Sequence, residues 1–346
     1  MTALRSVQAG RSIQRGFVLA ATLWMLAILT VFAIYFAQRI QRARELTQLA
    51  ATHAAALLDL SNTRAEILFR IATTPFSIYG LGTSANDAIA LDDRPYLEPG
   101  DTLVRLQDNR GLLNLNLADD DRLDRFLNVL GAPATSRAAL IDALRDYIDE
   151  DDLKHLNGAE ATDYAAAGLP APRNAKLVTP MEARRIYGWA AVAQLWQDNL
   201  LPRLASTSGS YSLNPNTASW QVLATMRGMT PEGALAIVQA RKLAPIVNPE
   251  QIEALTGIRI STDPFQAGAL AFPANSVRVT QQPKAMSWGW EYNVTLTPVS
   301  DTAPWRIDYS YRVELPSFDA ARQPVRPLPA RVAPTASQPG SLVPFL

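Results

Sequence analysis

One long apolar stretch near the N-terminus limits what this chain can fold into. Residues 17–37 carry no charged side chain, and neither Gly nor Pro occurs between Phe17 and Thr74. A helix rises about 1.5 Å per residue, so this stretch is long enough to cross a bilayer core of about 30 Å. Because Gly and Pro are the usual helix breakers, we expect the helix to continue well beyond the membrane.

A short basic segment precedes the apolar stretch. It contains Arg5, Arg11 and Arg15, has no acidic residue, and ends at Gly16 directly before Phe17. This arrangement resembles the leader of a type IV prepilin, which implies cleavage after Gly16 by a prepilin peptidase and Phe17 as the new N-terminus. The resemblance also implies a single pass through the bacterial inner membrane, with the bulk of the chain in the periplasm. An uncleaved signal anchor is the alternative, since secretory signals have a shorter apolar region of roughly 7–15 residues.

The fifth position after the implied cleavage site departs from the pilin pattern. Pilins and most pseudopilins carry Glu there, whereas this chain has Ala21. In a pilus that Glu meets the N-terminal ammonium of the subunit above, because an unpaired charge in the apolar fibre core is expensive. A subunit with Ala21 cannot neutralise a neighbour above it, although its own Phe17 ammonium can be neutralised from below. We therefore expect this chain at the tip of a fibre. The alternative is that Ala21 is merely tolerated and that the subunit can sit anywhere in the fibre.

Composition argues against several classes of function. Lys and Arg total 32, as do Asp and Glu, so the net charge is zero and a polyanion is not expected as the main partner. The absence of Cys rules out disulfides and thiolate metal sites, and two His residues leave little material for zinc or general-base chemistry. The sequence has no GxSxG, Walker, HExxH or CxxC motif, so we do not expect an enzyme.

Hydrophobic periodicity predicts an α+β fold. The N-terminal helix should end before Pro75 and pack one apolar stripe on a sheet. Leu103–Leu106 and Leu112–Leu117 are predicted to form a hairpin around residues 108–111, with Gly111 at a positive φ. This hairpin should join the strands at the C-terminal end of the chain in one sheet, because two strands alone are marginal.

From Asp119 the apolar spacing changes to three and four residues, which predicts helices. Strands return near Asn275, and period-two patterns over Trp288–Leu296 and Trp305–Leu315 predict two more strands. After Pro316 the chain is rich in Pro, and we expect a disordered or extended tail. The helices predicted by the spacing, with Asn216 or Thr217, Thr230 and Asn248 as N-caps, lie at Leu123–Leu130, Ala139–Ile148, Met181–Ile186, Ala190–Gln197, Thr217–Met226, Pro231–Lys242 and Pro249–Leu255.

The densest acidic segment is a candidate metal site. Residues 146–152 read DYIDEDD, and Asn157, Gly158, Glu160 and Asp163 follow. Carboxylates this close repel one another unless a cation or solvent screens them, and Ca²⁺ takes roughly six to eight oxygen ligands. A solvated helix end is the other interpretation, and the residues alone do not decide between the two.

A second motif resembles the helix-hairpin-helix module, which grips nucleic-acid phosphates through backbone N–H groups. Residues 213–218 read LNPNTA before a predicted helix, and residues 228–230 read GMT before the next. The second Gly of the usual hairpin tip is missing, and the nearby cations are Arg227, Arg241 and Lys242. We therefore expect no nucleic acid as a partner.

Three blocks, taken with the leader and Ala21, resemble the K-type minor pseudopilins of type II secretion, the general secretion pathway protein K family. The blocks are DNRGLLNLNL at Asp108–Leu117, LIDALRDYIDEDDLKHLNGAEATDY at Leu140–Tyr164 and LNPNTASWQVL at Leu213–Leu223. The family has an acidic pattern similar to WIDxDD…GAExxY. Here Tyr147 replaces the Trp, and the gap before Tyr164 is longer.

The resemblance implies a fold, a function and partners. The fold is a type IV pilin-like long N-terminal helix plus an antiparallel sheet, with a large inserted all-α domain. The function is to cap the periplasmic tip of the pseudopilus with the I-type and J-type minor pseudopilins, above the major pseudopilin. The competing class is an accessory pilin of a DNA-uptake or adhesion pilus.

The resemblance also implies calcium binding at the acidic segment, and it divides the chain into parts. By position the calcium ligands fall on Asp149, Asp151, Asp152 and Glu160, with Glu150, Asn157 and Asp163 as further candidates. The parts are a leader at 1–16, the transmembrane part of the helix at 17–37, the first pilin-like part at 38–118, an inserted helical domain at 119–274, C-terminal strands at 275–316 and a Pro-rich tail at 317–346.

Overall fold

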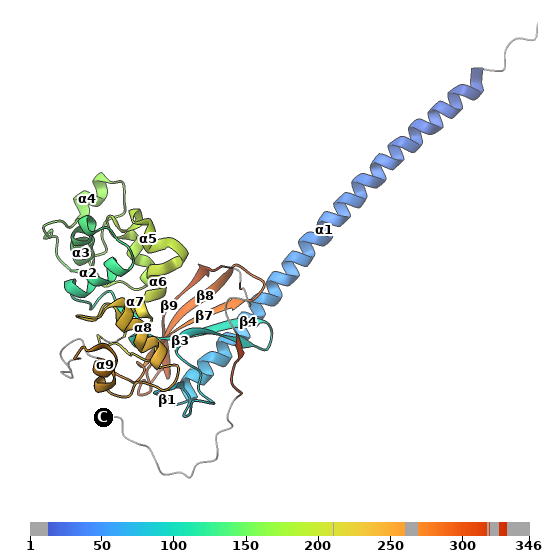
Figure 1. The fold of residues 1–346 in the computed structure, drawn as a ribbon. Coiled ribbons are helices and arrows are strands. Elements are labelled where there is room, and N and C mark those ends of the chain that lie inside the picture. Colours follow the sequence, from blue (N-terminus) through green and yellow to red (C-terminus); the bar gives the residue numbers. More distant parts are fainter. Residues whose placement is uncertain (1–12, 210, 260–268, 317, 319–324, 331–346) are drawn as a thin grey trace, which may run out of the picture. The chain divides into compact units, whose positions relative to one another are not determined.

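The computed structural model describes residues 13–209, 211–259, 269–316, 318 and 325–330 (Figure 1). Helix α1 runs without interruption from Ile13 to Thr73. It ends where the sequence predicts, with the N–H of Thr74 donating to the carbonyl of Arg70 at 2.9 Å just before Pro75. Residues 1–12 of the predicted leader lie outside the described residues.

The chain forms two compact units, Met1–Leu58 and Asp59–Leu346. In the first unit, α1 holds a stretch that is long and apolar enough to cross a membrane, with a mean hydropathy of 2.5. The large apolar side chains from Phe17 to Phe36 are all more than half exposed, as expected of a surface that faces lipid. The second unit begins with the last part of α1 and contains the other helices and the strands.

A six-stranded sheet organises the second unit, with the strand order β10-β3-β4-β7-β8-β9. All neighbours pair antiparallel except β10 and β3, which pair parallel. This confirms the predicted α+β class and the two C-terminal strands. The strands are β3 (Asp92–Glu98), β4 (Thr102–Asp108), β7 (Ser276–Pro283), β8 (Trp288–Leu296), β9 (Trp305–Glu314) and β10 (Arg326–Pro327).

One face of the sheet packs on the end of α1, as the apolar stripe predicts. Ile67 and Ile71 of the helix are 0% and 2% exposed, and they share a core with Val279 and Tyr292 of the sheet. Arg64 adds a cation–π contact, with its guanidinium carbon 5.0 Å from the centre of the Tyr292 ring. A short ribbon of β1 (Phe76–Ser77) and β2 (Gly80–Leu81) follows the helix.

The predicted hairpin at Leu103–Leu117 is wrong. After β4 the chain turns through a 3-10 helix at Asn109–Gly111, and β4 pairs instead with β3 and β7. The short strand β5 (Leu113–Asn114) pairs in parallel with β6 (Ala205–Ser206), in a separate sheet. Gly111 does not have the predicted positive φ. Glycine is needed there because Gln107 approaches so closely that a Cβ would lie 2.2 Å from its Nε2.

A β-bulge in β9 changes which side chains share a face. Asn293 of β8 faces Tyr309, whereas the next residue, Val294, faces Ile307, so Asp308 is the extra residue. The period-two pattern predicted one common face for the apolar residues of β9. The bulge instead leaves Ile307 against the α1 core and places Tyr309 on the opposite face, where it pairs with the buried Asn293.

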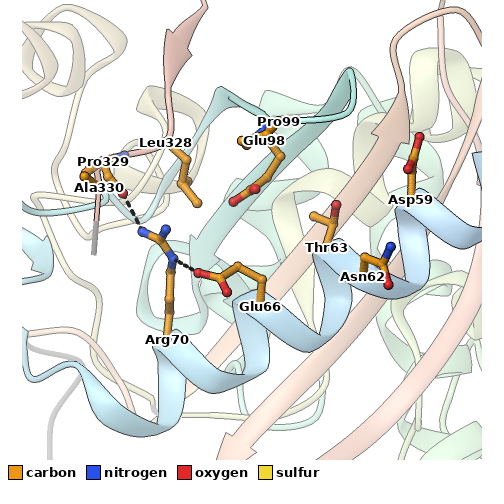
Figure 2. Close-up of a pocket in the computed structure, with 10 residues that line it drawn as sticks. All are labelled: Asp59, Asn62, Thr63, Glu66, Arg70, Glu98, Pro99, Leu328, Pro329 and Ala330. Carbon is orange, nitrogen blue, oxygen red and sulfur yellow. Dashed lines mark hydrogen bonds and ion pairs between the residues drawn. The ribbon is translucent and has the colours of Figure 1, made fainter. Parts of the chain in front are cut away.

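Part of the Pro-rich tail, at residues 325–330, is extended and returns to the sheet, a pairing that the sequence did not predict. Strand β10 pairs with β3, and the N–H of Leu328 donates to the carbonyl of Leu97 at 3.0 Å. Figure 2 shows Arg70 of α1 joining Glu66 and the carbonyl of Pro329, at 2.7 and 2.6 Å. These residues line a cavity of about 550 Å³ beside the β3–β4 turn.

The other helices form a block between β4 and β7, with one core that includes Leu123, Phe126, Leu144, Trp189 and Leu223. The predicted helices are present but several are shorter, and Met181–Ile186 is a 3-10 helix over Pro180–Arg185. The α-helices of the block are α2 (Asp120–Val129), α3 (Ala134–Ile148), α4 (Ala161–Ala166), α5 (Ala193–Trp196), α6 (Leu200–Leu204), α7 (Trp220–Leu223), α8 (Pro231–Ala240) and α9 (Pro249–Thr256).

N-caps decide where these helices begin. Thr230 and Asn248 cap α8 and α9 as predicted, each accepting from the N–H three residues on. The cap of α7 is Ser219, and neither Asn216 nor Thr217 has that role. The hydroxyl of Thr217 instead donates to Oδ2 of Asp108 at 2.9 Å.

The block contains one short motif twice. Residues 113–119 read LNLNLAD and residues 213–219 read LNPNTAS. In each copy the first Asn side chain accepts from the N–H two residues on, at 3.0 and 2.9 Å, and its carbonyl accepts from the N–H four residues on. The last residue of each copy, Asp119 or Ser219, caps the next helix. The two copies therefore form the same turn, one before α2 and one before α7.

The second Asn of each copy ties the turn to a distant segment. Asn116 exchanges two hydrogen bonds with the backbone of Leu177, and Asn216 exchanges two with that of Ile246. Each side-chain amide also donates to a carbonyl further along the chain. The Asn-Pro-Asn-Thr-Ala block thus has a structural role.

Asp108, at the end of β4, joins the sheet to the block and is fully buried. Its Oδ1 accepts from the N–H groups of Arg110 and Ala274, at 3.0 and 2.8 Å, where the chain enters and leaves the block. Its Oδ2 accepts from Asn214 and Thr217, both at 2.9 Å. All four contacting groups are donors, which is the arrangement that suits a carboxylate.

A second polar joint lies on the sheet face opposite α1. Arg278 of β7 donates to the carbonyls of Pro202 and Arg203 at the end of α6, both at 2.7 Å. Its Nε lies 3.9 Å from Glu291, which accepts from the hydroxyl of Tyr311 at 2.5 Å. Arg278 and Glu291 are 2% and 5% exposed, so this buried pair orients the block on the sheet at a cost in desolvation.

Candidate metal centre

The acidic segment begins on the last turns of α3. Asp142 and Asp146 are four residues apart and therefore lie on one face of the helix, and Asp149 follows as its C-cap. Leu140 and Leu144 pack the opposite side of α3 into the core of the block. Asp146 is nevertheless completely buried, with 0% exposure, because the loop at residues 155–158 covers it.

The chain then folds back over these carboxylates. The N–H of His155 donates to Oδ1 of Asp146 at 3.0 Å, and the N–H of Asn157 donates to Oδ2 of Asp142 at 2.9 Å. At Gly158 the backbone comes so close that a Cβ would lie 1.8 Å from Oδ2 of Asp146. Glycine is therefore required at position 158 for the loop to close over the carboxylate.

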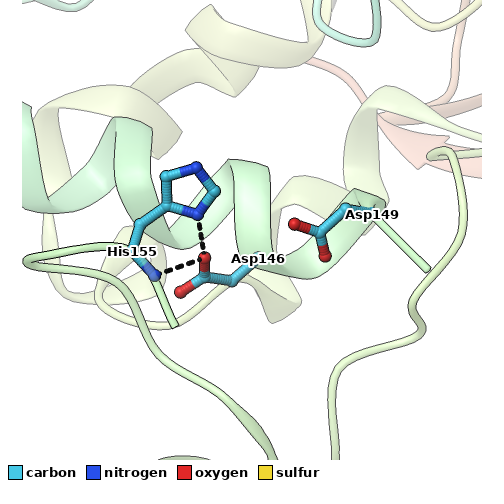
Figure 3. Close-up of side chains that lie close together, drawn as sticks. All are labelled: Asp146, Asp149 and His155. Atoms are coloured by element: carbon cyan, nitrogen blue, oxygen red, sulfur yellow. Dashed lines mark hydrogen bonds and ion pairs between the residues drawn. The ribbon is translucent and has the colours of Figure 1, made fainter. Parts of the chain in front are cut away.

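Three side chains from the two sides of this fold come together. Figure 3 shows Asp146, Asp149 and His155, whose candidate ligand atoms all lie within 4.8 Å of one another. Nδ1 of His155 lies 2.5 Å from Oδ1 of Asp146, and this hydrogen bond raises the pKa of the imidazole. When protonated, the imidazole therefore partly balances the charge of the buried Asp146.

Several carboxylate oxygens of this cluster remain without a hydrogen bond. Within the described residues, no donor reaches Oδ2 of Asp146, Oδ1 of Asp149 or either carboxylate oxygen of Glu160, and all of these atoms are buried. Burial, followed by the charges of Asp146 and Asp149, raises the pKa of Glu160. Burial and the charge of Asp151 likewise raise the pKa of Asp149. Buried, mutually repelling oxygens without donors are what a hard cation such as Ca²⁺ would satisfy, so the residues present fit that ion.

The other predicted ligands make contacts of their own. Oδ1 of Asp151 accepts from the N–H of Leu153 at 2.8 Å, and Asp152 accepts from Asn174 at 3.3 Å. Asp151, Asp152 and Glu150 are exposed. The charges of Asp151 and Asp152 still contribute to the raised pKa of Glu160, which puts both at the edge of the cluster.

Two candidates point away from the cluster. The side-chain amide of Asn157 donates to Asp142 at 3.0 Å, and Asp163 forms an ion pair with Lys154 at 2.9 Å. Asp163 also accepts from the N–H of Glu160 at 3.0 Å, which begins α4. Both residues therefore position the loop that carries Glu160.

Sequence reasoning missed Asp146 as a candidate ligand and His155 as a member of the cluster. Asp146 belongs to the acidic segment, but the family pattern begins its acids later in the segment. The signal that could have found it is the helical spacing of Asp142, Asp146 and Asp149, which places three carboxylates on one side of α3. Nothing in the spacing of His155 indicates that its ring reaches back to Asp146.

The helix-hairpin-helix resemblance finds little support in the geometry. Arg241, one of the three nearby cations, turns inward and donates to the carbonyls of Pro215 and Ala218. Lys242 donates to the side chain of Gln239 at 2.9 Å. Glu232 occupies the first turn of α8, where a phosphate would have to bind, and its charge would repel that ligand.

The residues of the predicted cleavage site lie on a continuous helix. Gly16 and Phe17 belong to α1, and the side chain of Phe17 is 76% exposed. Ala21 lies one turn further on, and its side chain is exposed. These positions agree with a helix that is free to pack against neighbouring helices, and they stay predictions as a cleavage site and as a register position.

Comparisons with known proteins give two family matches. Models described as type II secretion system (T2SS), protein K match residues 102–207 and residues 213–271. A search of curated proteins found no match. Among solved structures, the chain is similar to a chain of the GspK-GspI-GspJ complex from the enterotoxigenic Escherichia coli type 2 secretion system, at 16% identity and a TM-score of 0.46, over 80% of this chain and 99% of that chain.

The two matched stretches follow one another and run from the start of β4 to just before β7. They include the acidic cluster, both copies of the Asn-x-Asn motif and the joint at Asp108. They extend over nearly the whole helical block, which is the part of the fold that a plain pilin-like helix and sheet would lack. This chain belongs to the type II secretion system protein K family.

Proposed function

We propose that this chain caps the periplasmic tip of the type II secretion pseudopilus and is needed there for protein export. As a member of the protein K family it is a minor pseudopilin of the type II secretion system, in a family that is not known for enzymes. The apolar stretch of α1 fits anchoring in the inner membrane. The complex of the similar chain contains GspI and GspJ, so we propose the I-type and J-type minor pseudopilins as partners, with the major pseudopilin below.

The observation that carries the tip position is Ala21. A subunit without a carboxylate at this position leaves the ammonium of any subunit above it uncompensated in an apolar medium, which is costly. The helical block supports the same position for an independent reason. It is fixed to the sheet by the buried joints at Asp108 and Arg278, so it cannot swing aside for a neighbour without breaking them.

Cross-linking tests the tip position. Single cysteines can be introduced at exposed sites of the block, such as Leu243, because the chain has no cysteine of its own. In assembled pseudopili we expect no cross-links from the block to a major pseudopilin packed above it. Gold label on this chain should mark one end of the fibre. Label spread along the fibre, or frequent cross-links to major pseudopilin from the top of the block, would show that the position is wrong.

We also propose that the acidic cluster holds Ca²⁺. Asp146, Asp149 and Glu160 would supply the buried oxygens, and Asp151 and Asp152 lie at its edge. When bound, the ion would neutralise carboxylates that otherwise repel one another. The chain's own residues already set the frame: Gly158 admits the loop, His155 and Asn157 fasten it to α3, and the Asp163 cap begins α4.

Cleavage of the leader gives a separate prediction. Gly16→Asp should leave the precursor uncut, because the prepilin peptidase must accommodate the residue before the cleaved bond. Mass spectrometry of the wild-type chain isolated from the inner membrane should find Phe17 as the N-terminus, and the variant should retain residues 1–16. A wild-type chain that begins at any other residue would contradict the prepilin leader and favour a signal anchor.

A further inference from the structure

We propose that residues 150–157, here called the leucine loop, form a docking surface for a protein partner with an apolar pocket and a basic rim. The inference rests on the proposed tip position, because a partner beyond the fibre end must meet an exposed part of the block. Leu153 is 76% exposed and Leu156 is 92% exposed. Neither leucine belongs to the core of the block, so these side chains do not stabilise the fold by burial.

The leucines stand on a backbone that is already fixed. The N–H groups of His155 and Asn157 donate to Asp146 and Asp142 of α3, at 3.0 and 2.9 Å. Gly158 closes the loop with its N–H donating to the carbonyl of His155 at 3.1 Å. A partner that binds here has little loop ordering to supply, which is the condition under which a few apolar side chains act as strong anchors.

The charges around the leucines indicate the chemistry of the partner. The two cations of the loop are engaged, Lys154 with Asp163 at 2.9 Å and the His155 ring with Asp146 at 2.5 Å. Lys154 and His155 are exposed as well, but their charges are matched by these partners. Among the ion pairs of the described residues none includes Glu150, Asp151 or Asp152, which are exposed, so the unmatched charge beside the leucines is acidic. An apolar tip with an acidic collar complements a pocket with a rim of Lys and Arg.

The same charges argue against a lipid surface. Loops and helices that insert into membranes pair their apolar side chains with Lys and Arg, which anionic headgroups attract. Here the collar has the opposite sign, and an anionic leaflet would repel it. A membrane is therefore the alternative that the experiment has to detect.

Leu243 provides a matched control. It is 93% exposed just after α8, in the same block, but carries no acidic collar of this kind and has Lys242 beside it. Scattered single apolar side chains of this exposure are normal on protein surfaces. Replacing Leu243 with Ser therefore tests whether losing any exposed leucine matters.

The test uses the full-length chain in a secreting strain that lacks its own copy, with export of a reporter enzyme into the medium as the readout. We expect Leu153→Ser/Leu156→Ser to lower export at least tenfold, with unchanged chain level and unchanged melting temperature in detergent. Leu243→Ser should export as wild type does. Glu150→Lys should also lower export, whereas Glu253→Lys on α9 should not.

Full export by the double leucine variant would overturn the proposal that the leucine loop is a docking surface, while leaving the proposed function intact. Failure of the wild-type chain to restore export would instead overturn the proposed function, and the loop with it. A photo-reactive residue at position 156 separates the partner classes. Adducts to a peptide rich in Lys and Arg, lost in Glu150→Lys, would support the proposal, and adducts to lipid alone would overturn it.

Discussion

Replacing Asp108 with Ala should lower the free energy of unfolding by about 3 kcal/mol or more, the largest effect that we expect of any single side chain that joins the block to the sheet. The carboxylate accepts from Arg110, Ala274, Asn214 and Thr217. Its removal takes away charge-assisted bonds and leaves the N–H groups of Arg110 and Ala274 and the side-chain amide of Asn214 without this acceptor. Asp108→Asn should be nearly as damaging, because its amide would place a donor against donors.

The control is Asp119, the N-cap of α2, which accepts from the N–H of Arg122 and from the hydroxyl of Tyr211. Asp119→Ala loses an exposed cap and should cost about 1 kcal/mol. Urea unfolding of the full chain in detergent, followed by tryptophan fluorescence, compares the variants. Equal midpoints for Asp108→Ala and Asp119→Ala would mean that the joint does not hold the block to the sheet.

Glu160→Gln should have opposite effects with and without calcium. In the wild type, Ca²⁺ at about one hundred times its dissociation constant should add about 2.7 kcal/mol to the stability, and the variant should lose most of this. In calcium-free protein the variant should be more stable than the wild type, since it removes the charge that burial and the carboxylates of Asp146 and Asp149 disfavour. A residue with only a structural role would not change the sign of its effect.

The pH dependence provides a second readout of the same cluster. Burial and neighbouring carboxylates raise the pKa of Glu160, so the folded calcium-free protein binds its proton more tightly than the unfolded chain does. The contribution is therefore favourable below the unfolded pKa of about 4.3 and is lost as the pH rises through the raised folded pKa. Calcium should remove this loss.

Thermal melts with chelator and with excess calcium, from pH 4 to 8, measure both effects. The matched control is Glu253→Gln, at a partly exposed carboxylate on α9 that pairs with Arg259, and it should respond to calcium as the wild type does. Identical melts with and without calcium, in protein shown to be metal-free at the start, would contradict the proposed site.

Local patterns predicted the elements that local physics decides. The length of α1 follows from the absence of Gly and Pro up to Thr74, and β8 and β9 follow from their alternation. The hairpin failed because the partner of β5 is Ala205–Ser206, far along the chain, and no turn signal encodes so distant a pairing. The face change within β9 depends on one bulged residue, Asp308, whose side chain accepts from Asn293 and Thr295.

The candidate site was predictable as a region but not as a set of atoms. The sequence placed Asp149 and Glu160 in it, and in the structure burial, followed by the charges of Asp146 and Asp149, raises the pKa of Glu160. The sequence could not show that Asn157 would donate to Asp142 or that Asp163 would pair with Lys154, because both contacts depend on how the loop folds back. The tail strand β10 was missed for a similar reason, since its pairing with β3 joins segments far apart in sequence.

The joint at Asp108 has a consequence for how such a chain could be rebuilt. The entry of the block at Arg110 and its exit at Ala274 donate to the same carboxylate oxygen, so the two ends of this long insertion lie side by side. A cut at these ends, closed by a short turn between β4 and β7, would leave an antiparallel pair whose register is already set from Thr102 to Asp108. The block is in this sense an insertion whose entry and exit meet at one oxygen atom of the strand that carries it.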